Sequence, residues 1–138
     1  MAELTKVVIV YDLDKTLCEK KRSDQTYKDV NPLIDNINIL NNLHNLGAEI
    51  IIETARNMLT QHNDESKVIQ NVGLDTLNWL KNNNIQYDGI KFGKTCGTCY
   101  IDDKALRPKE LIKIYNSLND KDDLNELNNA IEKYLEEN

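Results

Sequence analysis

The chain has 138 residues, a net charge of -6 at neutral pH and a hydrophobic content of 40%. This length and composition predict one globular domain that buries a core of its own, and they exclude a disordered chain. The acidic balance argues against a protein that coats nucleic acid, because that role needs clustered lysine and arginine.

No apolar stretch approaches the roughly 20 residues that span a bilayer. The short apolar run after Lys6 does not have the pattern of a signal peptide. The three cysteines are an odd number, which is typical of a reducing compartment without a disulfide framework. We therefore expect a cytoplasmic protein with no membrane partner.

The first strand is expected at residues 6–11, where a continuous apolar run is typical of a strand buried on both faces. It ends abruptly at Asp12 and Asp14. The polar connection over residues 17–31 is too long for a tight turn, so we expect a flap over the strand ends. Pro32 then opens a helix, which Gly47 ends.

The same succession of strand and helix continues along the rest of the chain. A strand at residues 48–53 ends at Thr54, and a polar loop leads to a helix between residues 66 and 81, with Gly73 as its weak point. A third strand is expected within residues 85–92, and a short fourth strand at 98–101. Strands that alternate with helices predict an α/β fold, Rossmann-like, with three layers (α/β/α) and a mostly parallel sheet.

Pro108 opens a further helix, and residues 120–138 form a charged helix with a narrow apolar stripe. We expect residues 1–119 to form the main domain and the helix at 120–138 to pack on it. The alternative is that this stripe forms a homodimer contact.

Polar clusters follow each of the four expected strands. Their members are Asp12, Asp14 and Thr16, then Thr54, then Lys94, and finally Asp102 and Asp103. Because the carboxyl ends of parallel strands share one edge, these clusters should converge in one crevice. Several carboxylates gathered there are costly unless a cation holds them, and a divalent metal is the natural candidate.

In these motifs the chain resembles the haloacid dehalogenase superfamily of phosphohydrolases. The matching runs are Asp12-Leu13-Asp14-Lys15-Thr16, Thr54-Ala55-Arg56-Asn57, Gly93-Lys94 and Tyr100-Ile101-Asp102-Asp103-Lys104. The chain is most similar to small members with a minimal cap or none, described as phosphatases of capsular polysaccharide biosynthesis.

The resemblance implies a role for each matched residue. Asp12 would attack phosphorus and form an aspartyl-phosphate, and Asp14 would act as the acid and base. Thr54 and Lys94 would contact the phosphoryl group. It further implies substrate contacts at Arg56 and Leu13, and a Mg²⁺ site formed by Asp12, Asp14 and Asp103, with Asp102 beside it.

The expected activity is therefore Mg²⁺-dependent hydrolysis of a small phosphate ester, such as a sugar, polyol or amino-alcohol phosphate. One alternative is a 5′-nucleotidase or a phosphatase of nucleic-acid ends, although the acidic charge disfavours long nucleic acids. Another is a non-catalytic binding module.

Purely structural roles stay open for several of these residues. Thr54 could cap the loop after its strand, and Asp102 and Asp103 could cap the amino end of the following helix. Lys91 could take the place of Lys94. Cys96 and Cys99 have the spacing of a zinc knuckle. However, only Cys18 and two scattered histidines remain as further ligands, so we assign this loop no role.

Overall fold

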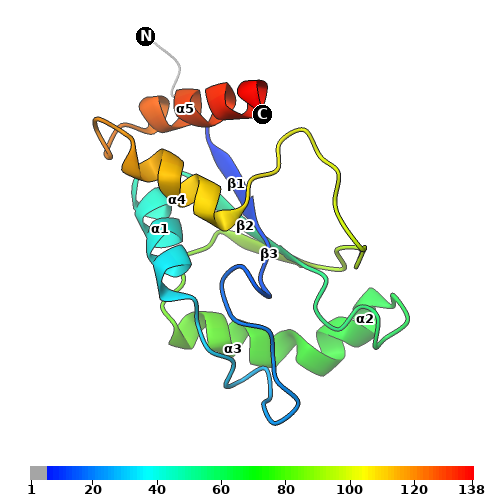
Figure 1. Ribbon diagram of the computed structural model, residues 1–138. Coiled ribbons are helices and arrows are strands. Elements are labelled where there is room, and N and C mark those ends of the chain that lie inside the picture. The colour runs from blue at the N-terminus through cyan, green and yellow to red at the C-terminus, as the bar shows by residue number, and fades with distance from the viewer. Residues whose placement is uncertain (1–5) are drawn as a thin grey trace.

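The computed structural model describes residues 6–138 (Figure 1). Three strands form one parallel sheet in the order β1-β2-β3. They are β1 (Val8–Tyr11), β2 (Glu49–Thr54) and β3 (Gly89–Phe92). The predicted α/β class and parallel sheet are therefore confirmed.

The helices lie between and after the strands as the sequence predicts. They are α1 (Ile34–Asn45), α2 (Glu65–Val68), α3 (Leu74–Asn82), α4 (Pro108–Asn116) and α5 (Leu124–Glu137). A π-helical segment, Ile69–Gly73, joins α2 to α3. It ends at the glycine that the sequence marks as the weak point of this helix.

Gly47 ends α1 by a local mechanism. Its φ of 107° is a left-handed conformation that costs a glycine little, and its N–H donates to the carbonyl of His44. The next residue, Ala48, donates its N–H to Leu43, which turns the chain directly into β2.

One face of the sheet is buried and the other is open. Ile50 and Ile52 of β2 point into the core, together with Leu40 and Leu43 of α1. On the opposite face, the side chains of Val8 and Val10 are 48% and 58% exposed. The expectation that β1 is buried on both faces is therefore wrong, and no helix of residues 6–138 covers this part of the sheet.

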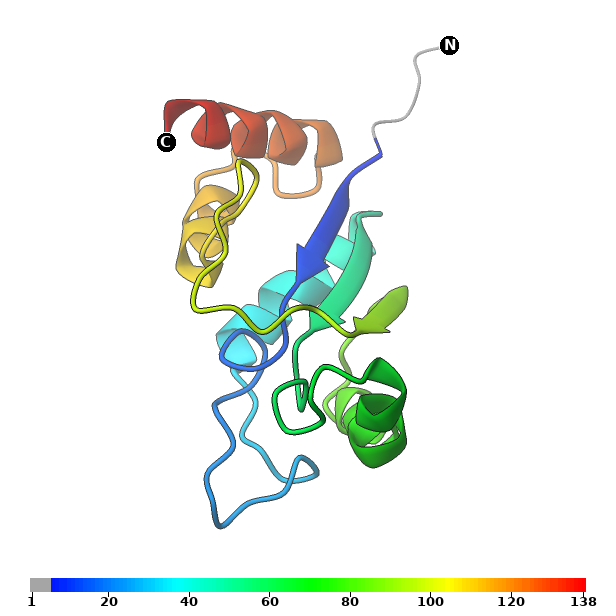
Figure 2. The same ribbon diagram turned by 90° about the vertical axis from the view of Figure 1, so that its right-hand side faces the viewer.

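The predicted fourth strand is also absent from the described residues. Residues 93–107 form a long loop between β3 and α4 (Figure 2), and Ile101 is 98% exposed. The propensity of a short segment for a strand depends on the neighbours it packs against, and this segment has not paired with a strand here. Among the described residues, β1 pairs only with β2, so its outer edge has no partner strand there.

The connection over residues 17–31 has neither helix nor regular strand, and it extends beyond the carboxyl ends of the strands (Figure 2). Its two ends are tied together, because the N–H of Glu19 donates to the carbonyl of Asn31 at 2.8 Å. The indole N–H of Trp79 in α3 donates to the carbonyl of Val30 at 2.9 Å. This segment is thus fastened to the fold at its base.

Helix α5 contributes to the main core. Leu127 is completely buried, and Leu124 and Ile131 pack against the same cluster. Tyr134 donates a hydrogen bond to Glu110 of α4, which also caps the start of its own helix at Arg107. The apolar stripe of α5 is therefore occupied by contacts within the chain.

Among residues 6–138, no helix has both the length and the apolar character needed to cross a membrane.

Candidate functional site

The ends of the three strands bring Asp12, Thr54 and Lys94 together. Asp12 directly follows β1, Thr54 ends β2, and Lys94 follows β3 after Gly93. The N–H of Lys94 donates to the carbonyl of Thr54 at 3.1 Å. The ammonium group of Lys94 then lies 3.8 Å from the carboxylate of Asp12. The edge of the sheet thereby joins a carboxylate and a cation that are 82 residues apart in the printed numbering.

The carboxylate of Asp12 is partly buried, and its surroundings only partly compensate its charge. Burial raises the pKa of Asp12 above the ordinary value of 3.8. A hydrogen bond from the N–H of Leu13 and the charge of Lys94 act in the opposite direction, but burial is the largest cause. The ionised form of Asp12 is therefore less stable here than in water, as is typical of reactive carboxylates at functional sites.

We expect Asp12→Asn to stabilise the protein at pH 7 in the presence of a chelator. Because the folded-state pKa of Asp12 is raised, its protonated form adds stability at low pH, and this stability is lost as the pH rises through that pKa. The neutral amide avoids this loss, so the melting temperature should rise by about 1–2 °C. The difference should shrink towards pH 4, and an equal or lower melting temperature at pH 7 would contradict the argument.

Asp14 does not face the site as a free carboxylate, because Arg56 binds both of its oxygens. The Nη2 of Arg56 donates to Oδ1 at 2.7 Å, and Nε donates to Oδ2 at 3.1 Å. The Arg56 side chain has no exposed surface. The guanidinium of Arg56 is therefore buried and already paired in this structure, and a contact from it to substrate stays a prediction.

The hydroxyl of Thr54 accepts a hydrogen bond from the N–H of Arg56 at 3.0 Å, and Thr54 is buried. This contact is the structural capping role that the sequence left open. The side chain of Leu13 is also completely buried, and its carbonyl accepts N–H groups from the turn that follows. Contacts from Thr54 and Leu13 to a substrate stay predictions.

Asp102 and Asp103 do not join Asp12 in this structure. Both are exposed in the loop after β3, and Asp102 accepts a hydrogen bond from the N–H of Lys104 at 2.9 Å. This bond, the largest cause, lowers the pKa of Asp102. Within residues 6–138, no group of three histidine, cysteine or acidic side chains is placed to hold a metal ion. The residues as arranged here therefore do not fit a complete Mg²⁺ site.

Nothing in the sequence identifies the residues that contact the guanidinium of Arg56. Cys18 and Tyr27, both within residues 17–31, and Thr76 of α3 surround its guanidinium. The sequence supports only the general expectation that a buried arginine needs hydrogen-bond acceptors and a stacking surface. It does not say which residues supply them.

The three cysteines differ sharply in their surroundings. Cys18 is completely buried, whereas Cys96 and Cys99 are exposed. Burial, assisted by the nearby charge of Asp14, raises the pKa of the Cys18 thiol to about 12. Its thiolate, the reactive form, is therefore nearly absent at neutral pH.

We expect an aromatic disulfide reagent at pH 8 to react rapidly with two thiols per native chain and with the third only after denaturation. Cys18→Ser should leave the rapid phase unchanged, and Cys96→Ser should remove half of it. Rapid reaction of all three thiols in the native protein would show that Cys18 is not shielded.

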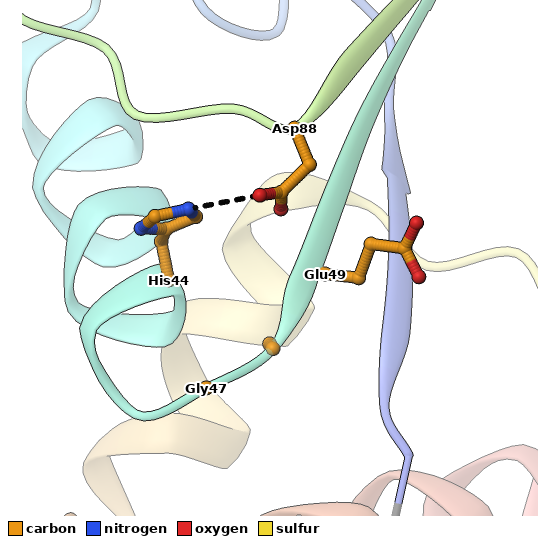
Figure 3. A pocket seen from close by; sticks show the side chains of 5 residues that line it. His44, Gly47, Glu49 and Asp88 are labelled. Carbon is orange, nitrogen blue, oxygen red and sulfur yellow. Dashed lines mark hydrogen bonds and ion pairs between the residues drawn. The ribbon is translucent and has the colours of Figure 1, made fainter.

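A shallow surface pocket lies at the amino end of β2, away from Asp12 (Figure 3). It is lined by His44, Gly47, Ala48, Glu49 and Asp88. Asp88 accepts a hydrogen bond from the N–H of Ile50 at 2.8 Å and lies 3.3 Å from Nε2 of His44. These contacts join α1 to the sheet and leave the carboxylate engaged, so the pocket is a structural junction rather than a reactive site.

No model of a known protein family matches the chain, and no curated protein matches it. Among solved structures, the crystal structure of an MCSG target from Vibrio cholerae is similar, with 37% sequence identity and a TM-score of 0.74. The match covers 93% of this chain and 98% of that chain. The chain therefore belongs to the same protein family as the Vibrio cholerae protein.

Proposed function

We propose that this protein is a phosphomonoester hydrolase of the haloacid dehalogenase superfamily, with Asp12 as its nucleophile. The observation that carries the proposal is the pair of Asp12 and Lys94 at the carboxyl edge of a parallel sheet, 3.8 Å apart. This edge is where α/β sheets bind ligands. The resemblance of the sequence motifs supplies the identity of the reaction.

In the proposed reaction, an oxygen of Asp12 forms a bond to phosphorus while the bond from phosphorus to the ester oxygen breaks. Asp14 gives a proton to the departing alcohol. Water then attacks the aspartyl-phosphate, Asp14 takes the proton from that water, and phosphate leaves. Lys94, whose ammonium group lies 3.8 Å from Asp12, would offset the negative charge that Asp12 and the phosphoryl oxygens bring together.

We also propose Mg²⁺ as the cofactor, bound by Asp12 and Asp103 with help from Asp14 and Asp102. This requires the loop over residues 93–107 to change its path. Such a change would let residues 98–101 pair with the unpaired edge of β1. Both segments carry exposed apolar side chains that this pairing could bring together. Pairing there would carry Asp103 towards the end of β1.

The substrate is proposed to be a small phosphate ester in the cell interior, such as a sugar, polyol or amino-alcohol phosphate. No inserted cap domain covers the site, since residues 17–31 form only a loop. A 5′-nucleotidase activity is the alternative within the same chemistry.

Phosphate release from p-nitrophenyl phosphate, measured with and without Mg²⁺, tests the proposal. We expect turnover that depends on Mg²⁺ and falls by at least about 10³-fold in Asp12→Asn. The matched control is Asp75→Asn, an acidic residue on α3. An inactive wild-type protein, or an Asp12→Asn variant with full activity, would overturn the proposal.

A panel of sugar phosphates and mononucleotides then distinguishes the two substrate classes. Faster turnover of mononucleotides would favour the nucleotidase. Binding of Mg²⁺ without turnover of any member would favour a non-catalytic module.

A further inference from the structure

Arg56 lies at the centre of a buried cluster that joins separate parts of the chain. Its guanidinium contacts Asp14 after β1, Cys18 and Tyr27 in the segment over residues 17–31, and Thr76 in α3. A fully buried arginine is costly to maintain unless each of its donors is satisfied. The burial of Arg56 among these partners therefore indicates that a fixed position of its guanidinium has a role in the protein.

The contacts to Asp14 fix both the place and the orientation of its carboxylate. Two hydrogen bonds, at 2.7 and 3.1 Å, bind both carboxylate oxygens to the same guanidinium. A lysine could supply the charge but not this paired geometry. Asp14 therefore keeps one orientation beside Asp12.

The remaining contacts fix Arg56 itself. Its Nη1 donates to the hydroxyl of Thr76 at 3.1 Å, and that hydroxyl donates to the carbonyl of Val72 at 2.7 Å. Val72 belongs to the π-helical segment, a kind of irregularity often found at functional sites. On another side, the ring of Tyr27 lies 4.1 Å from the guanidinium carbon.

Tyr27 connects this cluster to the segment that extends beyond the strand ends. The ammonium group of Lys21, also in this segment, lies 5.6 Å from the same ring. A ring stacked on an arginine restricts the arginine and excludes water from it. A displacement of residues 17–31 would therefore uncover Arg56 and loosen Asp14.

We propose that Arg56 is a positioning residue that holds the Asp14 carboxylate at the site, and that Tyr27 holds Arg56 in place. For the reaction step, this inference rests on the proposed function of Asp14. The contact between Tyr27 and Arg56 thereby couples the position of residues 17–31 to the Asp14 carboxylate, which transfers the proton in the proposed reaction. Arg56 acts through Asp14 and does not touch the substrate.

Steady-state kinetics with p-nitrophenyl phosphate provide the first test. Arg56→Gln should lower kcat by roughly 100-fold with KM within about threefold of wild type, because proton transfer is impaired while binding is not. Arg56→Lys should recover only part of kcat. Tyr27→Phe should retain activity, whereas Tyr27→Leu should lower kcat by about tenfold. The control is Arg22→Gln, an exposed arginine in the same segment paired with Asp24.

A rise in KM with unchanged kcat in Arg56→Gln would overturn the inference, because it would show direct binding of substrate. Unchanged kinetics in both Arg56→Gln and Tyr27→Leu would overturn it as well. If Arg56→Gln fails to fold, the Arg56→Lys and Tyr27→Leu variants still decide between these outcomes.

Nuclear magnetic resonance of the arginine Nε–H groups tests the cluster without any activity. We expect the Arg56 signal to exchange with water far more slowly than the Arg22 signal, and Asp14→Asn or Tyr27→Leu to shift it and accelerate its exchange. Equal exchange of both arginines in the wild-type protein would overturn the inference. An inactive wild-type protein with a protected Arg56 signal would overturn the proposed function alone.

Discussion

Asp14→Ala should destabilise the protein by about 3 kcal/mol, which is a large part of the stability of a domain of this size. The reason is that Arg56, the partner of Asp14, is buried. Removing the carboxylate leaves the charge of Arg56 without its counterion, in a place that water does not reach. Thermal or urea unfolding at pH 7 measures the change, and the melting temperature should fall by roughly 10 °C.

Asp12→Asn is the matched comparison, since it alters the neighbouring carboxylate two residues earlier. The two substitutions should shift stability in opposite directions, because Asp12 has no buried arginine against it and loses stability through its own burial. If Asp14→Ala unfolds at the same temperature as the wild-type protein, the ion pair with Arg56 does not form in solution.

Leu127→Ala should destabilise the protein by about 3 kcal/mol, because it opens a cavity where α5 meets the core. Leu127 is completely buried in the same cluster as the sheet and α1. Unfolding should remain a single transition in the variant, since α5 belongs to the same core. Calorimetry or denaturation followed by circular dichroism measures both quantities.

Leu74→Ala on α3 is the control, since its side chain is 71% exposed and its loss should cost less than about 0.5 kcal/mol. A small effect of Leu127→Ala, or a separate early transition assigned to α5, would show that this helix detaches from the domain in solution.

The sequence predicted most of the architecture because the relevant signals are local. Apolar runs, the proline at the start of α4 and the glycine after α1 each act over a few residues. The parallel sheet follows from the alternation of strands and helices. The prediction of a fourth strand was wrong for this structure, because residues 98–101 carry the propensity for a strand but pair with no strand here.

The candidate site was predictable to the extent that it depends on strand ends. Asp12, Thr54 and Lys94 meet because parallel strands share an edge. The role of Arg56 was not predictable, since a side chain that follows a strand end can turn towards solvent or into the core. Only the packing of Tyr27, Cys18 and Thr76 around it decides this, and those contacts span distant parts of the chain.

The unpaired edge of β1 has a consequence for the behaviour of the protein in concentrated solution. Within residues 6–138, no strand pairs with β1 on that side of the sheet, and its valines Val8 and Val10 are exposed. Such an edge is a template for a strand from another molecule, and natural proteins oppose this with charge. The net charge of -6 supplies that repulsion, so solubility should fall as salt screens it or as the pH approaches the sequence pI near 4.9.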